Sequence, residues 1–266
     1  MGNIYFTCSF DDGHITDMRL AELLGKYNLK GTFYIPRACN LFSTSLSESQ
    51  IRDLSGSIEV GGHTMSHLIL THISHEKAQQ EISNCKKWLE DVTGKTVSSF
   101  CPPVGRFNRY HIAAQQKAGF TAMRTVEMLS HSFQGIKKID DFVILPTTCQ
   151  VFNHTGMAYV RNNVKRMQFV KFPSLWRFFN ADWEMMSRNY INYLCEVSHR
   201  NNQQPVYFHL WGHSWEITAR SLWNPLERFF KHISEIPEIT PITNAGLANI
   251  TRQTNLQHET KALIAE

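Results

Sequence analysis

The chain has 266 residues, of which 42% are hydrophobic and 19% are charged, and its formal net charge is +4. This composition is typical of a folded globular protein and excludes an intrinsically disordered chain. Lys and Arg are dispersed, with no run longer than two, so the sequence does not indicate a nucleic-acid-binding surface. The mild basicity remains compatible with an anionic sugar, a sugar phosphate or a lipid-linked phosphate as a partner.

Short apolar runs alternate with amphipathic segments, the pattern of parallel strands joined by crossover helices. We expect strands at residues 4–10, 31–36, 58–62, 97–100, 121–125 and 205–213. We expect helices at residues 15–27, 47–54, 74–92, 110–118 and 222–232. The helix at 47–54 begins with a capping signature, Ser47 followed by Gln50, and Gly94 follows the helix at 74–92 as a stop signal. One domain over residues 1–255, followed by a flexible polar tail at 256–266, is therefore predicted.

Residues 150–200 depart from this alternation, because they are rich in Phe, Met, Trp and Asn. We expect a mostly helical insertion with a break at Pro173. Sugar rings stack on aromatic side chains, and four residues of the insertion are candidates for such a wall: Phe152, Tyr159, Trp176 and Trp183. At helical spacing, aromatic residues more often belong to the core, and we favour that interpretation.

Several features bear on where the protein works. The six cysteines contain no Cys-x-x-Cys pair, which is typical of buried thiols in a reducing compartment. A strand pattern begins almost at the first residue, with no basic leader and apolar core before it. No stretch has the roughly 20 apolar residues that span a bilayer. We therefore expect a cytoplasmic protein without a transmembrane segment.

Two adjacent carboxylates close the first predicted strand, in Asp11-Asp12-Gly13. Neighbouring side chains on a strand point to opposite faces, but a break at Gly13 would let both carboxylates approach one centre. One could then bind a metal while the other takes a proton from water. An Asp-Asp-Gly turn is also common in ordinary loops, so this motif needs support from elsewhere.

That support is His63-Thr64-Met65-Ser66-His67, which follows the predicted strand at 58–62. A helical turn over Thr64–His67 would project both imidazoles from one face. Two imidazoles and one carboxylate can hold a divalent cation and leave positions open for water and substrate. The chain has 13 histidines, and we interpret His14, His72 and His75 as loop or helix-cap residues rather than ligands.

A third cluster lies near the end of the last predicted strand, where His209 and Trp211 precede His213, Trp215 and Glu216. A histidine there could protonate a departing amine. We choose His213 for this role, because it is nearer the strand end, and expect His209 to be buried and hydrogen-bonded.

At these three places the chain resembles the polysaccharide deacetylase family (carbohydrate esterase family 4, NodB homology domain). Ser9 to Gly13 is similar to the first family motif, and His63 to His67 matches the second, His-(Ser/Thr)-x-x-His. The resemblance extends over about residues 4–215. It implies a distorted (β/α) barrel of about seven units, and metal-dependent removal of an N- or O-linked acyl group from a sugar.

Carried over by position, the resemblance makes Asp11 the catalytic base and makes Asp12, His63 and His67 the metal ligands. The cofactor it implies is a divalent transition metal, with zinc as the expected ion. The partner it implies is a carbohydrate: a polysaccharide, a lipid-linked sugar or a sugar precursor.

The chain departs from the family pattern in its third motif, Arg-x-Pro-x-Gly, whose Arg helps to orient the base. Pro103 and Gly105 are present, but Cys101 stands at the position of that Arg. Arg106 follows directly and is a candidate substitute.

The fifth motif also departs from the usual Leu-x-His. Its sequence is similar to a His-Pro-Trp-Glu variant of some family branches, which favours His213 over His209 and brings Trp211 and Trp215 near the substrate. The Asp-Trp motif of the family has no clear counterpart, and Asp182, Asp140 and Asp141 remain rival positions.

Three functions are compatible with these motifs. The first is hydrolysis of an N-acyl (acetyl) group from an amino sugar. The second is deformylation, or hydrolysis of another non-peptide C–N bond, on a lipid-linked or small substrate. The third is a carbohydrate-binding protein with impaired catalysis, which the loss of the motif Arg at Cys101 would explain.

Overall fold

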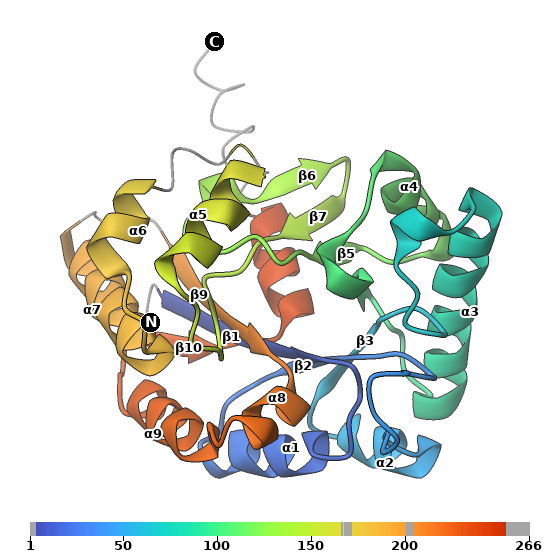
Figure 1. The fold of residues 1–266 in the computed structure, drawn as a ribbon, viewed down its shortest axis with the longest axis horizontal. Coiled ribbons are helices and arrows are strands. Elements are labelled where there is room, and N and C mark those ends of the chain that lie inside the picture. The colour runs from blue at the N-terminus through green and yellow to red at the C-terminus, as the bar shows by residue number, and fades with distance from the viewer. Residues whose placement is uncertain (1–3, 166, 168–171, 201–204, 254–266) are drawn as a thin grey trace.

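A curled, mostly parallel sheet forms the centre of the molecule, with helices packed around it (Figure 1). The computed structural model describes residues 4–165, 167, 172–200 and 205–253. Within these residues the sheet has ten strands: β1 (Ile4–Asp11), β2 (Thr32–Ile35), β3 (Glu59–Gly62), β4 (Ser99–Phe100), β5 (Ala122–Arg124), β6 (Lys137–Ile139), β7 (Phe142–Leu145), β8 (Cys149–Gln150), β9 (Val206–Gly212) and β10 (Ile239–Pro241). Their order is β6-β7-β5-β4-β3-β2-β1-β9-β8, and β10 pairs with the beginning of β1. The strand order does not close on itself, so the expected distorted barrel is confirmed as a curled half-barrel.

The strands pair in parallel except for β6 and β7, which form an antiparallel hairpin. β1 lies inside the order, between β2 and β9, and is buried over nearly its whole length. A strand that is buried on both faces needs helices on both sides, which explains the continuous apolar run at residues 4–10. The predicted strands are all confirmed, although the ends differ by one or two residues.

The helices are α1 (Asp17–Lys26), α2 (Glu48–Leu54), α3 (His75–Thr93), α4 (Arg109–Ala118), α5 (Gly156–Lys165), α6 (Phe172–Phe178), α7 (Trp183–Arg200), α8 (Ser214–Ala219) and α9 (Trp223–Ser234). The predicted start of α2 is confirmed, because Ser47 and Gln50 form a capping box. Gly94 ends α3 in the left-handed conformation, at φ 66°, which a glycine adopts without strain. No helix within the described part of the chain is long and apolar enough to cross a membrane.

Residues 150–200 are mostly helical, as expected, and supply α5, α6 and α7. Pro173 is the second residue of α6, where a missing N–H leaves no helical bond unmade, so here it helps to start a helix. Tyr159 and Trp183 are buried, which confirms the core interpretation for these two. For Trp176 that interpretation is wrong, because its side chain is 84% exposed. The predicted tail at 256–266 lies outside the described residues.

The parallel strands bring five chain segments to one edge of the sheet. Asp11 is the last residue of β1, and Arg124 is the last residue of β5. Three more residues directly follow a strand: His63 after β3, Cys101 after β4 and His213 after β9. Carboxyl ends of parallel strands meet at the same edge, which is where (β/α) barrels carry their sites. The topology therefore explains why residues 200 positions apart meet.

Candidate active site

A pocket of about 380 Å³ opens at this carboxyl edge. It collects most of the chemistry-bearing residues predicted from the sequence: Asp11, Asp12, His63, His67, Trp211, His213 and Trp215. Leu41, Val104, Val126 and Met128 add an apolar wall, and α5 contributes Ala158 and Asn162. The pocket thus combines titratable groups with an apolar surface, as ligand sites commonly do.

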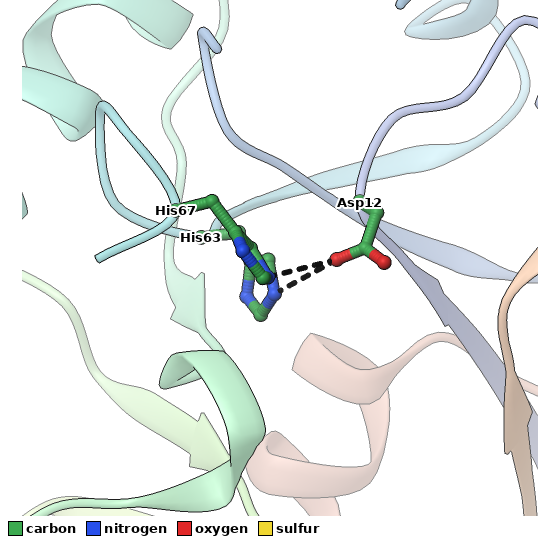
Figure 2. A group of neighbouring side chains, drawn as sticks. All are labelled: Asp12, His63 and His67. Carbon is green, nitrogen blue, oxygen red and sulfur yellow. Dashed lines mark ion pairs between the residues drawn. The ribbon is translucent and has the colours of Figure 1, made fainter. Parts of the chain in front are cut away.

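Asp12, His63 and His67 converge within the pocket (Figure 2). Asp12 Oδ1 lies 3.4 Å from His63 Nε2 and 3.1 Å from His67 Nε2. One ligand atom of each residue lies within 4.8 Å of the other two. These two contacts, with the charge of His213, outweigh burial and hold the pKa of Asp12 well below its ordinary value. A carboxylate and two imidazoles of this kind fit a divalent transition metal.

The backbone orients the first of these imidazoles. His63 Nδ1 lies 2.6 Å from the carbonyl oxygen of Cys101. A carbonyl can only accept, so Nδ1 carries a hydrogen, and Nε2 is the ring atom that faces Asp12 and could bind a metal. This is the arrangement found for metal-binding histidines, whose other ring nitrogen donates to a fixed acceptor.

The expected helical turn over Thr64–His67 is wrong. Thr64 and His67 have left-handed backbones, with φ of 66° and 50°, and the segment is a loop. The buried carboxylate of Glu81 holds the loop, because Ser66 N donates to its Oε2 at 2.8 Å. Asp12 is also left-handed, at φ 83°. Such non-glycine residues store about 1–3 kcal/mol of strain each and cluster at functional sites.

Arg124 pairs with Asp11, and sequence reasoning missed it. Its Nη2 donates to Asp11 Oδ1, and its side chain is fully buried. The guanidinium lies 5.3 Å from the ring centroid of Tyr34 and 4.8 Å from that of Trp211. Cys101 Sγ lies 3.8 Å from Asp11 Oδ2. Burial raises the pKa of Cys101 well above its ordinary value, so the thiol stays neutral beside the carboxylate.

Arg106 does not take the place of the motif Arg, which corrects that expectation. Its Nη1 donates to His72 Nε2 at 2.9 Å on the exposed surface. Pro103 and Gly105 form a short 3-10 turn beside the pocket. Gly105 has φ 63°, and a Cβ at that position would collide with Val126. This turn therefore requires glycine for both its conformation and its space.

His213 directly precedes α8 and follows β9, which lies on the opposite side of β1 and β3 from β5 in the strand order. Its Nδ1 is 2.5 Å from Glu216 Oε2, and its Nε2 is 4.0 Å from Asp12 Oδ2. Burial acts to lower the pKa of His213, but Glu216 and the two aspartates raise it above its ordinary value. Trp215 Nε1 donates to Asp12 Oδ2 at 2.9 Å.

Glu216 is thus the carboxylate beside His213, and the rival aspartates lie elsewhere. Asp182 caps α7 by accepting from the Glu184 N–H. Asp140 and Asp141 form the turn between β6 and β7. A carboxylate three residues after a candidate histidine, at the start of a helix, was a signal that the sequence contained.

His209 is buried and hydrogen-bonded, as expected. Its Nε2 lies 2.9 Å from Ser9 Oγ, and the side chain is fully buried. Burial and the nearby charge of Arg124 hold the pKa of His209 well below its ordinary value, so the ring is neutral. It lies behind the pocket rather than in its lining.

The fold and the family agree. The polysaccharide deacetylase family model matches residues 3–123, which include both the Asp11-Asp12 and the His63–His67 motifs. Residues 3–123 therefore match this family, and the resemblance read from the motifs is confirmed over that part of the chain.

Two curated relatives and one solved structure are similar to the chain. Over 121 residues it is 27% identical to YxkH of Bacillus subtilis (strain 168), which is named for polysaccharide deacetylase; this covers 45% of this chain and 43% of YxkH. Over 102 residues it is 30% identical to the peptidoglycan-N-acetylmuramic acid deacetylase PdaC of the same strain, covering 38% of this chain and 21% of PdaC. The match spans less than half the length of either relative. A polysaccharide deacetylase structure from Mycobacterium smegmatis shares the fold, with a TM-score of 0.68 at 13% identity over 96% of this chain and 92% of that one.

Proposed function

We propose that this protein is a metal-dependent hydrolase that removes an N-acyl group, acetyl first among them, from an amino sugar of a glycan or glycan precursor. The observation that carries the proposal is the convergence of Asp12, His63 and His67 in a pocket that also holds Asp11 and His213. The names of YxkH and PdaC support the class of reaction.

Asp12, His63 and His67 would hold the metal, with zinc as the expected ion. When bound, a divalent ion supplies Lewis acidity, which polarises an acyl carbonyl and makes a water molecule easier to deprotonate. The contact of His63 Nδ1 with the Cys101 carbonyl supports this assignment, because it directs Nε2 toward Asp12 and His67.

Asp11 would accept the proton of the attacking water. Asp11 is not part of the group of possible metal ligands, and one of its carboxylate oxygens already accepts from the Arg124 guanidinium. That contact fixes the direction of the carboxylate. Arg124 acts on the reaction through Asp11, so it is a positioning residue.

His213 would protonate the departing nitrogen. The raised pKa of His213 supports this role, because an acid must carry its proton before the bond breaks. Glu216 binds Nδ1, which leaves Nε2 as the proton donor toward the pocket. The proposed base and acid thus lie in one pocket, Asp11 held by Arg124 and His213 held by Glu216.

Trp211 would bind a substrate oxygen. It lines the pocket, and its buried Nε1 has no hydrogen-bond partner among the described residues. A buried N–H without a partner is unfavourable, and an acyl or hydroxyl oxygen of the substrate would satisfy it.

The test combines metal content with product analysis. Purified protein is loaded with zinc and offered N-acetylglucosamine oligomers and peptidoglycan, with acetate and formate measured separately. Asp11→Asn should retain the metal and lose turnover, whereas His63→Ala should lose both. His75→Ala, at the first turn of α3 outside the pocket, is the matched control and should retain both.

Other outcomes would replace the proposal. Formate without acetate would favour the deformylase alternative. A protein that binds these glycans but takes up no stoichiometric metal would favour the non-catalytic alternative.

A further inference from the structure

Large apolar side chains are exposed on α5, on α6 and just beyond each of them. We call these residues the α5–α6 patch: Met157, Val164, Met167, Trp176 and Phe179. Trp176 is 84% exposed and Met167 80%. Single exposed apolar residues are ordinary, but several long ones on neighbouring helices mark an interaction surface.

The outward face of α5 mixes apolar and basic residues. At 100° per residue, Met157, Arg161, Val164 and Lys165 fall on one side of the helix. Tyr159 and Asn163 lie on the opposite side and are buried. A helix that packs through one face and presents Met, Val, Arg and Lys on the other suits a membrane interface better than bulk water.

The charge of this region has one sign. Residues 142–181 contain no Asp or Glu but hold five Lys and Arg, more than the net charge of +4 of the whole chain. Three of them, Arg161, Lys165 and Arg177, are exposed. Within the described residues no ion pair involves Arg161 or Lys165, and their exposed positive charges are complementary to an anionic partner.

The α5–α6 patch is continuous with the rim of the pocket. Ala158 and Asn162 line the pocket wall and are the chain neighbours of Met157 and Arg161. On other segments of the rim, Leu41 and Val104 are 58% and 59% exposed. An apolar surface that meets the pocket mouth would orient the mouth toward whatever the surface binds.

We propose that the α5–α6 patch docks the protein on an anionic lipid bilayer. The apolar side chains enter the headgroup region while Arg161, Lys165 and Arg177 contact lipid phosphates. The pocket then faces substrates held at the membrane surface. This inference goes beyond the proposed hydrolase activity and does not depend on it.

The experiment is co-sedimentation of the full chain with vesicles of phosphatidylcholine alone or with about 30% phosphatidylglycerol. Wild-type protein should bind the anionic vesicles and be released as salt rises. Arg161→Ser with Lys165→Ser should weaken binding by about fivefold for each charge removed. Met157→Ser with Trp176→Ser should weaken it by about tenfold or more.

The matched control lies on α4, away from α5 and α6 (Figure 1). Tyr110 is exposed to 51% and Lys117 is exposed in the last turn, so Tyr110→Ser with Lys117→Ser removes one apolar group and one charge. Its binding should equal that of the wild type. Circular dichroism checks that each variant is folded, and zinc uptake, which uses none of these residues, tests the metal site independently.

Three outcomes would overturn the proposal. One is wild-type protein that binds neither kind of vesicle. Another is binding that Met157→Ser with Trp176→Ser leaves unchanged. A third is a dimer in light scattering that the same double substitution abolishes, since the patch would then bind a second copy of the chain.

Discussion

Replacing Arg124 by Met tests whether the buried ion pair positions the proposed base. Arg124 is fully buried and Asp11 is 3% exposed, so the substitution leaves a carboxylate buried without its partner. Breaking a buried pair in this way costs about 3–5 kcal/mol. We expect that loss in the free energy of unfolding, measured by urea denaturation. Where the variant is folded, turnover should fall about 100-fold, because the base loses its direction.

The kinetic constants separate positioning from mere stability. A base that has lost its direction lowers kcat, whereas KM should change little, because Arg124 does not line the pocket. Arg106→Met, which removes a surface contact with His72, should leave both stability and kcat unchanged. Adding Cys101→Arg to Arg124→Met should restore part of the activity. If Arg124→Met lost stability but kept its kcat, the positioning role would be refuted.

Three further changes test other parts of the structure. Burial raises the pKa of Asp17 to about 8, so between about pH 4 and pH 8 the folded state holds a proton that the unfolded chain has released. The free energy of unfolding should therefore fall with rising pH across this interval, by up to about 1.4 kcal/mol per pH unit. Asp17→Asn should flatten this slope in urea denaturation at a series of pH values. An unchanged slope in that variant would mean that Asp17 is ionised in the folded protein. Gly105→Ala should destabilise the folded protein by about 1–3 kcal/mol in thermal unfolding, because it places a Cβ on a left-handed backbone and against Val126. Gly135→Ala is the control, because its Cβ would meet open space. Zinc at about 100 times its Kd should stabilise the protein by about 2.7 kcal/mol in calorimetry, and His67→Ala should lose this gain; equal gains in both proteins would place the zinc elsewhere.

The sequence predicted those elements whose pattern is local. The strand at 4–10 is a continuous apolar run, and α2 and α3 carry their own start and stop signals in Ser47 and Gly94. By contrast, β8 has two residues and β10 has three. Strands this short have no periodicity, and they exist because β9 and β1 offer them an unpaired edge.

The same distinction holds within the candidate site. The spacing of His63 and His67 indicated that they act together, but not how the chain turns between them. The turn depends on Glu81, which α3 brings to the Ser66 N–H from fifteen residues away. A helical turn was the simplest local solution, and a contact from another element replaced it with a left-handed loop.

The third motif keeps its position beside Asp11 and His63 although Cys101 stands where the family has Arg. The backbone and the side chain at this position contribute differently: the carbonyl oxygen accepts from His63 Nδ1, and any residue type provides it. Only the side chain's contact with Asp11 depends on residue identity, and Arg124 makes that contact from the end of β5. Asp11, Cys101 and Arg124 end or follow three strands whose carboxyl ends share one edge, so a guanidinium from either position can reach the same carboxylate. A sequence motif assigns the contact with the base to one position of the chain, whereas several positions at this sheet edge are close enough to make it.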